Sequence, residues 1–229
     1  MPRNGSIRIL AHGPFGDAVA EHLVGLSGRD ERPVRVTDER SGPGLGAFLA
    51  GGDLGVLASF RDVASDLEAF AAAAASASVA WLPIALGMRQ VRVGPLVVPG
   101  TAPCGACYSA RLAQHGQAAG TASTDLEHAL EQDDALGVEG YPPHLVAIAA
   151  GLALTLARWP ASDGVASPLF LIDVASDAVA SWQVIGVHGC QGCDGAANGL
   201  AAVAKRTERL RALAAGVCPP PGDVVRKAL

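Results

Sequence analysis

The feature that most constrains this sequence is a pair of Cys-x-x-Cys motifs that lie far apart in the chain. Cys104 and Cys107 form the first motif, and Cys190 and Cys193 form the second. The two-residue spacing lets a tight turn direct both sulfurs at one ion, and two such motifs supply the four thiolates of a tetrahedral zinc site. Glycine and proline flank both motifs and suit such turns. The sequence therefore predicts a structural four-cysteine zinc site.

Other uses of paired cysteines fit this chain less well. Two disulfides would need an oxidising compartment, and the N-terminus lacks the apolar segment of a secretory signal peptide. A redox-active Cys-x-x-Cys usually occurs singly, near a βαβ unit. A catalytic zinc is disfavoured because four thiolates leave no coordination position for water or substrate. Cys218 has no cysteine near it, and we predict that it is not a ligand.

The distance between the motifs indicates what the metal does. Roughly 80 residues separate them, far more than in a zinc finger, so one ion would join two distant parts of a domain and close a long loop. We expect residues 1–217 to form that single domain and residues 218–229 to be a C-terminal tail.

Composition narrows the classes of partner. The net charge is −5 and no basic patch is visible, which argues against nucleic acid. The longest uncharged run, 145–157, is too short to cross a bilayer and indicates a buried helix. Half of the residues are hydrophobic but only 4% are aromatic, so the core should consist of small aliphatic side chains. We expect a soluble, cytoplasmic protein that binds neither nucleic acid nor membrane.

The N-terminal part has the pattern of a Rossmann-like α/β fold. An apolar strand at 7–11 precedes a turn with Gly13 and Gly16, then an amphipathic helix at 17–24 and a strand at 34–37. Further strands are predicted at 54–59, 79–86, 90–93, 96–98, 169–174 and 180–187, helices at 62–77, 108–115, 144–159 and 196–215, an exposed helix or mobile segment at 117–138, and a loop at 41–52. Asp62 is a plausible N-cap, and Pro83 suggests an irregular or edge strand.

The glycine turn admits two interpretations. Such a turn can bind the phosphates of a dinucleotide or of ATP. Here His12 occupies one glycine position, and Pro14, which has no N–H, lies where a phosphate-binding amide is needed. We predict instead that the glycines let the helix pack closely on the strand.

The segment around the first motif resembles a known family. Residues 93–100 (Val-Gly-Pro-Leu-Val-Val-Pro-Gly), followed by Cys104, Cys107 and Arg111, are similar to the ThiF-like, ubiquitin-activating-enzyme-like superfamily. They most resemble the cyclodehydratase "C" component of thiazole/oxazole-modified peptide biosynthesis, whose second knuckle is similar to the segment from Val187 to Cys193. The resemblance covers about 7–194 and implies a Rossmann-like ThiF-type fold with a mixed sheet.

The resemblance also implies ligands and partners. It implies structural zinc on Cys104, Cys107, Cys190 and Cys193, and a homodimer. It implies an accessory role, in which the protein binds the leader of a ribosomal precursor peptide and presents it to a YcaO-type partner that uses ATP to form azolines. Members of this branch usually carry a winged-helix-like peptide-binding domain before the ThiF-like part. This chain begins almost directly with the first strand, so we expect the leader to be bound in another way, for example by a separate protein.

Three functions follow as alternatives. The first is a non-catalytic scaffold or recruitment subunit of an azoline-forming complex, with no catalytic or cofactor-binding residue of its own. The second is an ATP-dependent adenylating enzyme that acts on a peptide or carrier-protein C-terminus; it is disfavoured because no phosphate- or magnesium-binding residues are recognisable. The third is a zinc-stabilised homodimer with an unrelated partner. His188 would either pack beside the site or donate a hydrogen bond to a sulfur from outside the tetrahedron. Arg111 would either offset the charge of the site or be solvated.

Overall fold

The computed structural model describes residues 6–27, 34–37, 43–116, 122–133, 135–159, 168–187, 189–190 and 192–193. The predicted helix at 196–215, His188 and Cys218 lie outside these residues. The boundary between a domain at 1–217 and a tail at 218–229 therefore stays a prediction.

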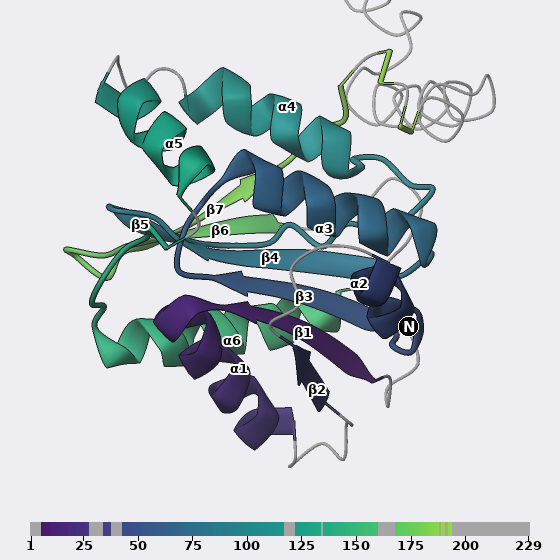
Figure 1. The fold of residues 1–229 in the computed structure, drawn as a ribbon, viewed down its shortest axis with the longest axis horizontal. Helices are drawn as coiled ribbons and strands as arrows, with labels where there is room; N and C mark the ends of the chain where they lie inside the picture. Colours follow the sequence, from purple (N-terminus) through teal and green to yellow (C-terminus); the bar gives the residue numbers. More distant parts are fainter. Residues whose placement is uncertain are drawn as a thin grey trace, which may run out of the picture.

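One seven-stranded mixed sheet forms the centre of the fold, in the order β2-β1-β3-β4-β5-β6-β7 (Figure 1). Neighbouring strands from β2 to β4 are parallel, whereas β5, β6 and β7 are added as antiparallel strands. The strands are β1 (Ile7–His12), β2 (Val34–Thr37), β3 (Leu54–Ser59), β4 (Ala80–Leu86), β5 (Gln90–Val93), β6 (Pro168–Asp173) and β7 (Val179–Gln183). The predicted hairpin of β6 and β7 is confirmed.

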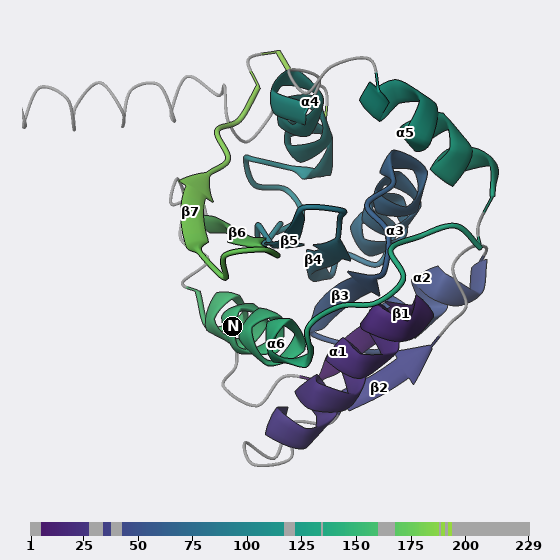
Figure 2. The ribbon, with the colours of Figure 1, turned by 90° about the vertical axis from the view of Figure 1, so that its left-hand side faces the viewer.

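Helices cover both faces of the sheet. The described helices are α1 (Gly13–Ser27), α2 (Pro43–Ala50), α3 (Ala64–Ser76), α4 (Gly105–Gly116), α5 (Ala122–Gln132) and α6 (Pro143–Ala157). Figure 2 shows α1 and α6 on one face and α2, α3 and α4 on the other. Two buried clusters match these layers: one joins the sheet to α1 and α6, and the other joins it to α2, α3 and Tyr108 of α4.

Two predictions about local structure are wrong. The predicted loop at 41–52 contains α2, because Leu45 and Leu49 are one helical turn apart and both are buried in the second cluster. Asp62 is not the N-cap of α3; Val63 holds that position without a side-chain hydrogen bond. The Asp62 carboxylate instead accepts a hydrogen bond from the Arg92 guanidinium, an ion pair that local sequence does not reveal.

Pro83 does not lie in an edge strand, because β4 pairs with β3 on one side and β5 on the other, but the pairing with β5 is irregular beside it, which was the other predicted alternative. The ladder with β5 ends at the pair Ile84 and Val93, and the Gly94 N–H donates to the Pro83 carbonyl oxygen over 2.7 Å. The missing Pro83 N–H thus falls just beyond the end of that ladder. The strand predicted at 96–98 does not form; this segment makes one isolated β-bridge, between Val97 and Trp81.

None of the helices in the described ranges is both long enough and apolar enough to cross a membrane.

Candidate metal centre

The first cysteine motif lies at the start of α4. Cys104 directly precedes the helix, and its carbonyl oxygen accepts the Tyr108 N–H over 3.0 Å, which closes the first turn. Gly105 permits a close approach, since a Cβ there would lie 3.1 Å from the Ala71 side chain of α3. Both sulfurs therefore lie at a helix N-terminus, where the peptide dipoles favour a thiolate.

The second motif forms a compact turn after β7. The Cys190 N–H donates to the Val187 carbonyl oxygen, and the Cys193 N–H donates to the Cys190 carbonyl oxygen, each over 3.3 Å. Gly189 has a φ of 73°, a value that glycine adopts without strain. A Cβ at Gly192 would lie 3.0 Å from the Cys104 sulfur, so this glycine lets the second turn approach the first.

The four sulfurs meet although the motifs are 86 positions apart. They lie within 4.8 Å of one another. Three of the sulfur–sulfur distances are 3.9 Å for Cys104 and Cys107, 3.6 Å for Cys104 and Cys190, and 3.4 Å for Cys107 and Cys193. A tetrahedral zinc with four thiolates at about 2.3 Å holds its sulfurs about 3.8 Å apart. The donor set and its spacing therefore fit a tetrahedral metal ion with no open position.

The surroundings also suit thiolate ligands. Cys107 and Cys193 are almost fully buried, with 0% and 4% of their surface exposed. The Val187 N–H donates to the Cys107 sulfur over 3.3 Å, which stabilises negative charge on that sulfur. A buried group of thiolates needs a cation, because unpaired buried charge is costly.

Without a metal, the thiols of Cys104, Cys190 and Cys193 differ in pKa. Burial, reinforced by the neighbouring Cys107 and Cys104 thiols, raises the pKa of Cys193 far above its ordinary value, and burial also raises the pKa of Cys104. Burial opposes ionisation of Cys190 as well, but hydrogen bonds from Cys107 and the Gly192 backbone N–H lower its pKa to about 7. Metal binding must therefore displace protons from the cluster and is expected to weaken at low pH.

Arg111 plays a role that neither sequence interpretation anticipated. Its guanidinium donates to the carbonyl oxygens of Ile185 and Gly186, over 3.1 and 3.3 Å, and to the Gln114 side chain over 2.7 Å. It thus ties α4 to the segment that leads from β7 to the second cysteine motif. These hydrogen bonds complement the four-cysteine cluster, which joins the same two segments.

The glycine turn after β1 has a packing explanation. A Cβ at Gly16 would overlap the Ala58 carbonyl oxygen of β3, so this glycine lets α1 lie directly against the sheet. Gly13 has a φ of 69°, and a Cβ there would overlap the Phe60 ring. Both glycines are thus required by contacts within the chain itself.

The space beside this turn is filled by protein. The Phe60 ring packs edge-on against the His12 ring at 4.9 Å, and a Cβ at Gly137 would also overlap it. The Val138 N–H donates to the Phe60 carbonyl oxygen, and the Tyr141 hydroxyl donates to the Pro14 carbonyl oxygen, both over 3.0 Å. The segment after α5 therefore covers the position at which this type of fold usually holds phosphate.

A buried polar cluster that the sequence analysis missed lies beside the turn. Arg61, 2% exposed, donates to both carboxylate oxygens of Asp66 over 2.8 and 3.2 Å, and to the carbonyl oxygens of Leu130 and Asp133. Burial raises the pKa of the Asp66 carboxyl, but hydrogen bonds from His12 and Arg61 outweigh it and lower the pKa to about 2. The arginine anchors the α5 segment over α3.

This cluster does not form a nucleophile–base relay. The Ser59 hydroxyl and an Asp66 carboxylate oxygen both lie 3.5 Å from the same imidazole nitrogen, Nδ1 of His12. A catalytic triad needs the nucleophile and the acid on opposite nitrogens of the ring. The arrangement is that of a buried structural network.

No model of a known protein family matches the sequence, and no curated protein matches it either. Solved structures do match. A heterocyclase in complex with substrate and cofactor has a TM-score of 0.59 at 15% identity, over 83% of this chain and 26% of that one. The heterocyclase TruD has a TM-score of 0.54 at 16% identity, over 82% and 27%.

A smaller protein matches over a larger share of its length. MccB from E. coli with MccA has a TM-score of 0.53 at 13% identity, over 83% of this chain and 67% of that one, and MccB is also solved with ATP. The chain spans about a quarter of the heterocyclases it matches. These neighbours confirm the predicted α/β fold with its mixed sheet, which this chain shares with the heterocyclases and with MccB.

Proposed function

We propose that this protein is an accessory subunit of an azoline-forming heterocyclase complex. It holds structural zinc on Cys104, Cys107, Cys190 and Cys193, recruits a ribosomal precursor peptide, and leaves ring formation to a YcaO-type partner. The observation that carries the proposal is the fold shared with a heterocyclase solved with its substrate and cofactor, across 83% of this chain. The homodimer and the leader-binding role implied by the resemblance belong to the same proposal.

The sulfur geometry supports zinc rather than another use of the cysteines. Buried thiolates in a closed tetrahedral arrangement, at a separation close to that around zinc, suit a metal that has no catalytic position. The sulfurs are also too far apart for disulfides, since a covalent S–S bond measures about 2.05 Å. When bound, zinc would supply folding energy and join α4 to the end of β7.

The glycine turn supports a role without adenylation. Phe60 and the segment 137–141 fill the space beside it, and Pro14 offers no N–H to phosphate. Opening this space for ATP would require the Phe60 ring to leave a buried position. The proposal therefore assigns ATP use to the partner.

Reconstitution tests the accessory role. The protein is combined with a YcaO-type protein and a short precursor peptide chosen from the neighbouring genes, and ring formation is followed by mass spectrometry as the loss of one water per azoline. We expect ring formation to slow at least tenfold when the chain is left out, and the chain to co-purify with one of the two components. Full activity without the chain, with no binding to either component, would refute the proposal.

Adenylation is the competing function, since MccB with a similar fold is solved with ATP. Calorimetry with ATP and magnesium, followed by pyrophosphate exchange in the presence of the precursor peptide, separates the two. We expect no saturable heat and no exchange. Saturable binding with exchange would favour the adenylating enzyme.

A further inference from the structure

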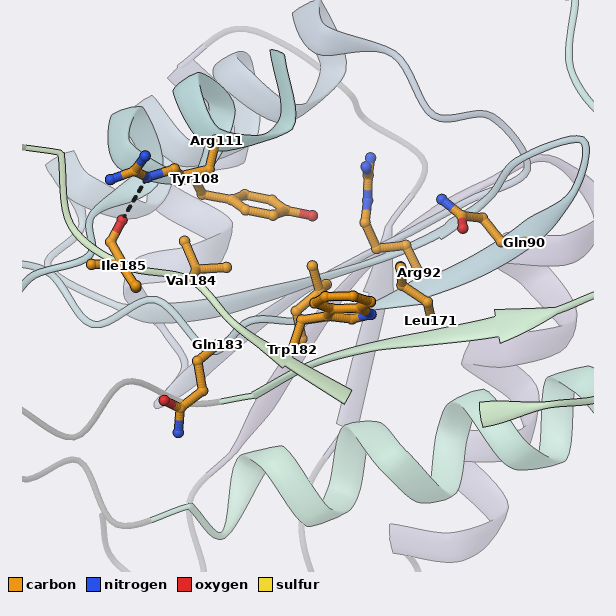
Figure 3. Close-up of a pocket in the computed structure, with 10 residues that line it drawn as sticks. Gln90, Arg92, Tyr108, Arg111, Leu171, Trp182, Gln183, Val184 and Ile185 are labelled. Atoms are coloured by element: carbon orange, nitrogen blue, oxygen red, sulfur yellow. Dashed lines mark hydrogen bonds between the residues drawn. The ribbon is translucent and has the colours of Figure 1, made fainter. Parts of the chain in front are cut away.

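A cavity of about 480 Å³ lies between α4 and the face of β5, β6 and β7 (Figure 3). The strand register pairs Arg92 with Leu171 and Leu169 with Trp182, so these side chains share one face of the sheet. The opposite face carries Ile172, which is buried in the cluster of α1 and α6. The cavity therefore lies on the sheet face that carries α4, at a place where α4 covers the strands only in part.

Two buried side chains at this cavity each keep one polar atom without a hydrogen-bond partner among the described residues. Arg92 is 8% exposed and Tyr108 is fully buried, and neither Nε of Arg92 nor the Tyr108 hydroxyl has a hydrogen bond to any described residue. Figure 3 shows the hydroxyl and the guanidinium pointing into the same space beneath α4. Unpaired buried polar groups are uncommon because each carries a desolvation cost. Their pairing with a ligand would remove that cost.

Both unpaired groups are donors. Burial raises the pKa of Tyr108 although the Arg92 charge favours the tyrosinate, so the hydroxyl keeps its proton at neutral pH. The Arg92 guanidinium carbon lies 5.7 Å from the centre of the Tyr108 ring. Asp62 accepts a hydrogen bond from a different guanidinium nitrogen, Nη2, and not from Nε. Arg111 adds a second positive charge, and none of the described residues that line the cavity is acidic. The cavity therefore suits a ligand that accepts hydrogen bonds and carries negative charge.

The rest of the wall is apolar. The Trp182 indole lies across the cavity from Tyr108 in Figure 3, and Leu171 lies beside it. Trp182 is 60% exposed and Ile185 is 66% exposed, which is high for side chains of this size and kind. A ligand whose anionic group reaches the buried donors would place its attached carbon skeleton against these side chains.

We infer that this cavity binds a carboxylate attached to an apolar or aromatic group. The geometry places one planar acceptor opposite Nε–H of Arg92 and O–H of Tyr108, with the hydrocarbon part against Trp182. A free small acid and an acidic residue of a peptide offer the same chemistry, and the test below separates them. The inference concerns binding alone and does not depend on the proposed partner.

The metal cluster holds the two walls of the cavity together. Tyr108 directly follows Cys107, and the Val187 N–H contacts the Cys107 sulfur. Arg111 binds the carbonyl oxygens of Ile185 and Gly186 on the opposite wall. The carboxylate site is thus formed before the ligand arrives, which favours binding because little ordering remains to be done.

The test compares acids with their neutral isosteres on the full-length protein. Calorimetry and tryptophan fluorescence are used with N-acetylphenylalanine against its amide, and with acetyl-Phe-Glu-amide against acetyl-Phe-Gln-amide. We expect at least one acid to bind roughly tenfold or more tightly than its amide, because hydrogen bonds to a charged group are strong. Binding of the first acid alone identifies a small-molecule site, and binding of the peptide alone identifies a peptide site; either supports the inference. Equal affinity for acid and amide in both pairs, or no saturable binding, would overturn it.

Tyrosine variants separate the site from general stability. Tyr108→Phe should weaken binding of the acid roughly tenfold without lowering Tm, because the lost hydroxyl has no described partner in the free protein. Tyr141→Phe is the matched control: its hydroxyl donates to the Pro14 carbonyl oxygen, so Tm should fall while acid binding stays unchanged. Unchanged affinity in Tyr108→Phe, or an equal loss in both variants, would contradict the assignment.

Discussion

The two ends of the sheet contrast sharply. At the parallel end, β2-β1-β3-β4 has the arrangement in which open α/β sheets bind ligands beyond the carboxyl ends of their strands. Here that position is occupied by Phe60, by the Arg61–Asp66 ion pair and by the segment after α5. At the antiparallel end, β5-β6-β7 is joined to α4 by four sulfurs and leaves a cavity with unpaired donors.

The difference indicates where this protein can bind a ligand. Beside the glycine turn of the parallel end, the Arg61 and Asp66 side chains satisfy each other, so a ligand there would have to displace existing contacts. At the antiparallel end buried donors lack partners, and the cavity already exists. A fold with a known ligand position therefore does not guarantee a ligand there, because function depends on the side chains that fill the site.

The largest expected effect comes from the metal cluster. Cys104→Ser should lower Tm by more than about 10 °C and release the metal, because binding to structural zinc is coupled to folding. Cys218→Ser serves as the control and should change Tm little. Thermal unfolding and elemental analysis of both variants measure this, and equal effects in the two would refute the proposed ligand set.

A pair of glycine variants tests the packing at the parallel end. Gly16→Ala should cost several kcal/mol, because the new Cβ would overlap the Ala58 carbonyl oxygen and α1 would have to shift. Gly25→Ala lies in the same helix with nothing within 4 Å of the new Cβ, and should stabilise the protein by about 0.5–1 kcal/mol. Denaturant unfolding of both variants gives the comparison. A neutral Gly16→Ala would show that the turn is not held by packing.

The smallest effect concerns acid sensitivity. The pKa of Asp66 is about 2 in the folded protein against an ordinary value of 3.8, so its stabilisation is complete above roughly pH 4 and is lost as the pH falls towards 2. The wild type should therefore exceed Asp66→Asn in stability by on the order of 1 kcal/mol at neutral pH, after allowing for solvent screening. Unfolding between pH 2 and 7 should show this difference shrinking below pH 4. A difference that does not depend on pH would exclude the ion pair as its cause.

Much of the fold follows from local pattern. The strands β2, β3 and β5 begin and end where hydrophobic alternation and turn residues predict. The helix α2 was missed because the glycine-rich composition of 41–52 suggested a loop, and only burial against α3 shows why Leu45 and Leu49 stabilise a helix there. Tertiary burial overrides weak local propensity in such segments.

For the candidate site, the sequence predicted the four cysteines but not the arginine contacts around them. The Cys-x-x-Cys spacing predicted which four residues group together, because that geometry is set by a turn of a few residues. The pairing of Arg92 with Asp62, 30 positions apart, and the attachment of Arg111 to Ile185, 74 positions apart, have no local signal. Long polar side chains can reach many partners, so their contacts are decided only by how the elements pack.

The sequence by itself determined the four-cysteine set, the Rossmann-like beginning and the β6–β7 hairpin, since each rests on short-range spacing. Only the tertiary structure decided that Phe60 fills the glycine turn and that Arg92 and Tyr108 meet beneath α4. The physical reason is that a void or an unpaired donor is a property of surfaces brought together from distant segments, and such properties are not encoded in any one of them.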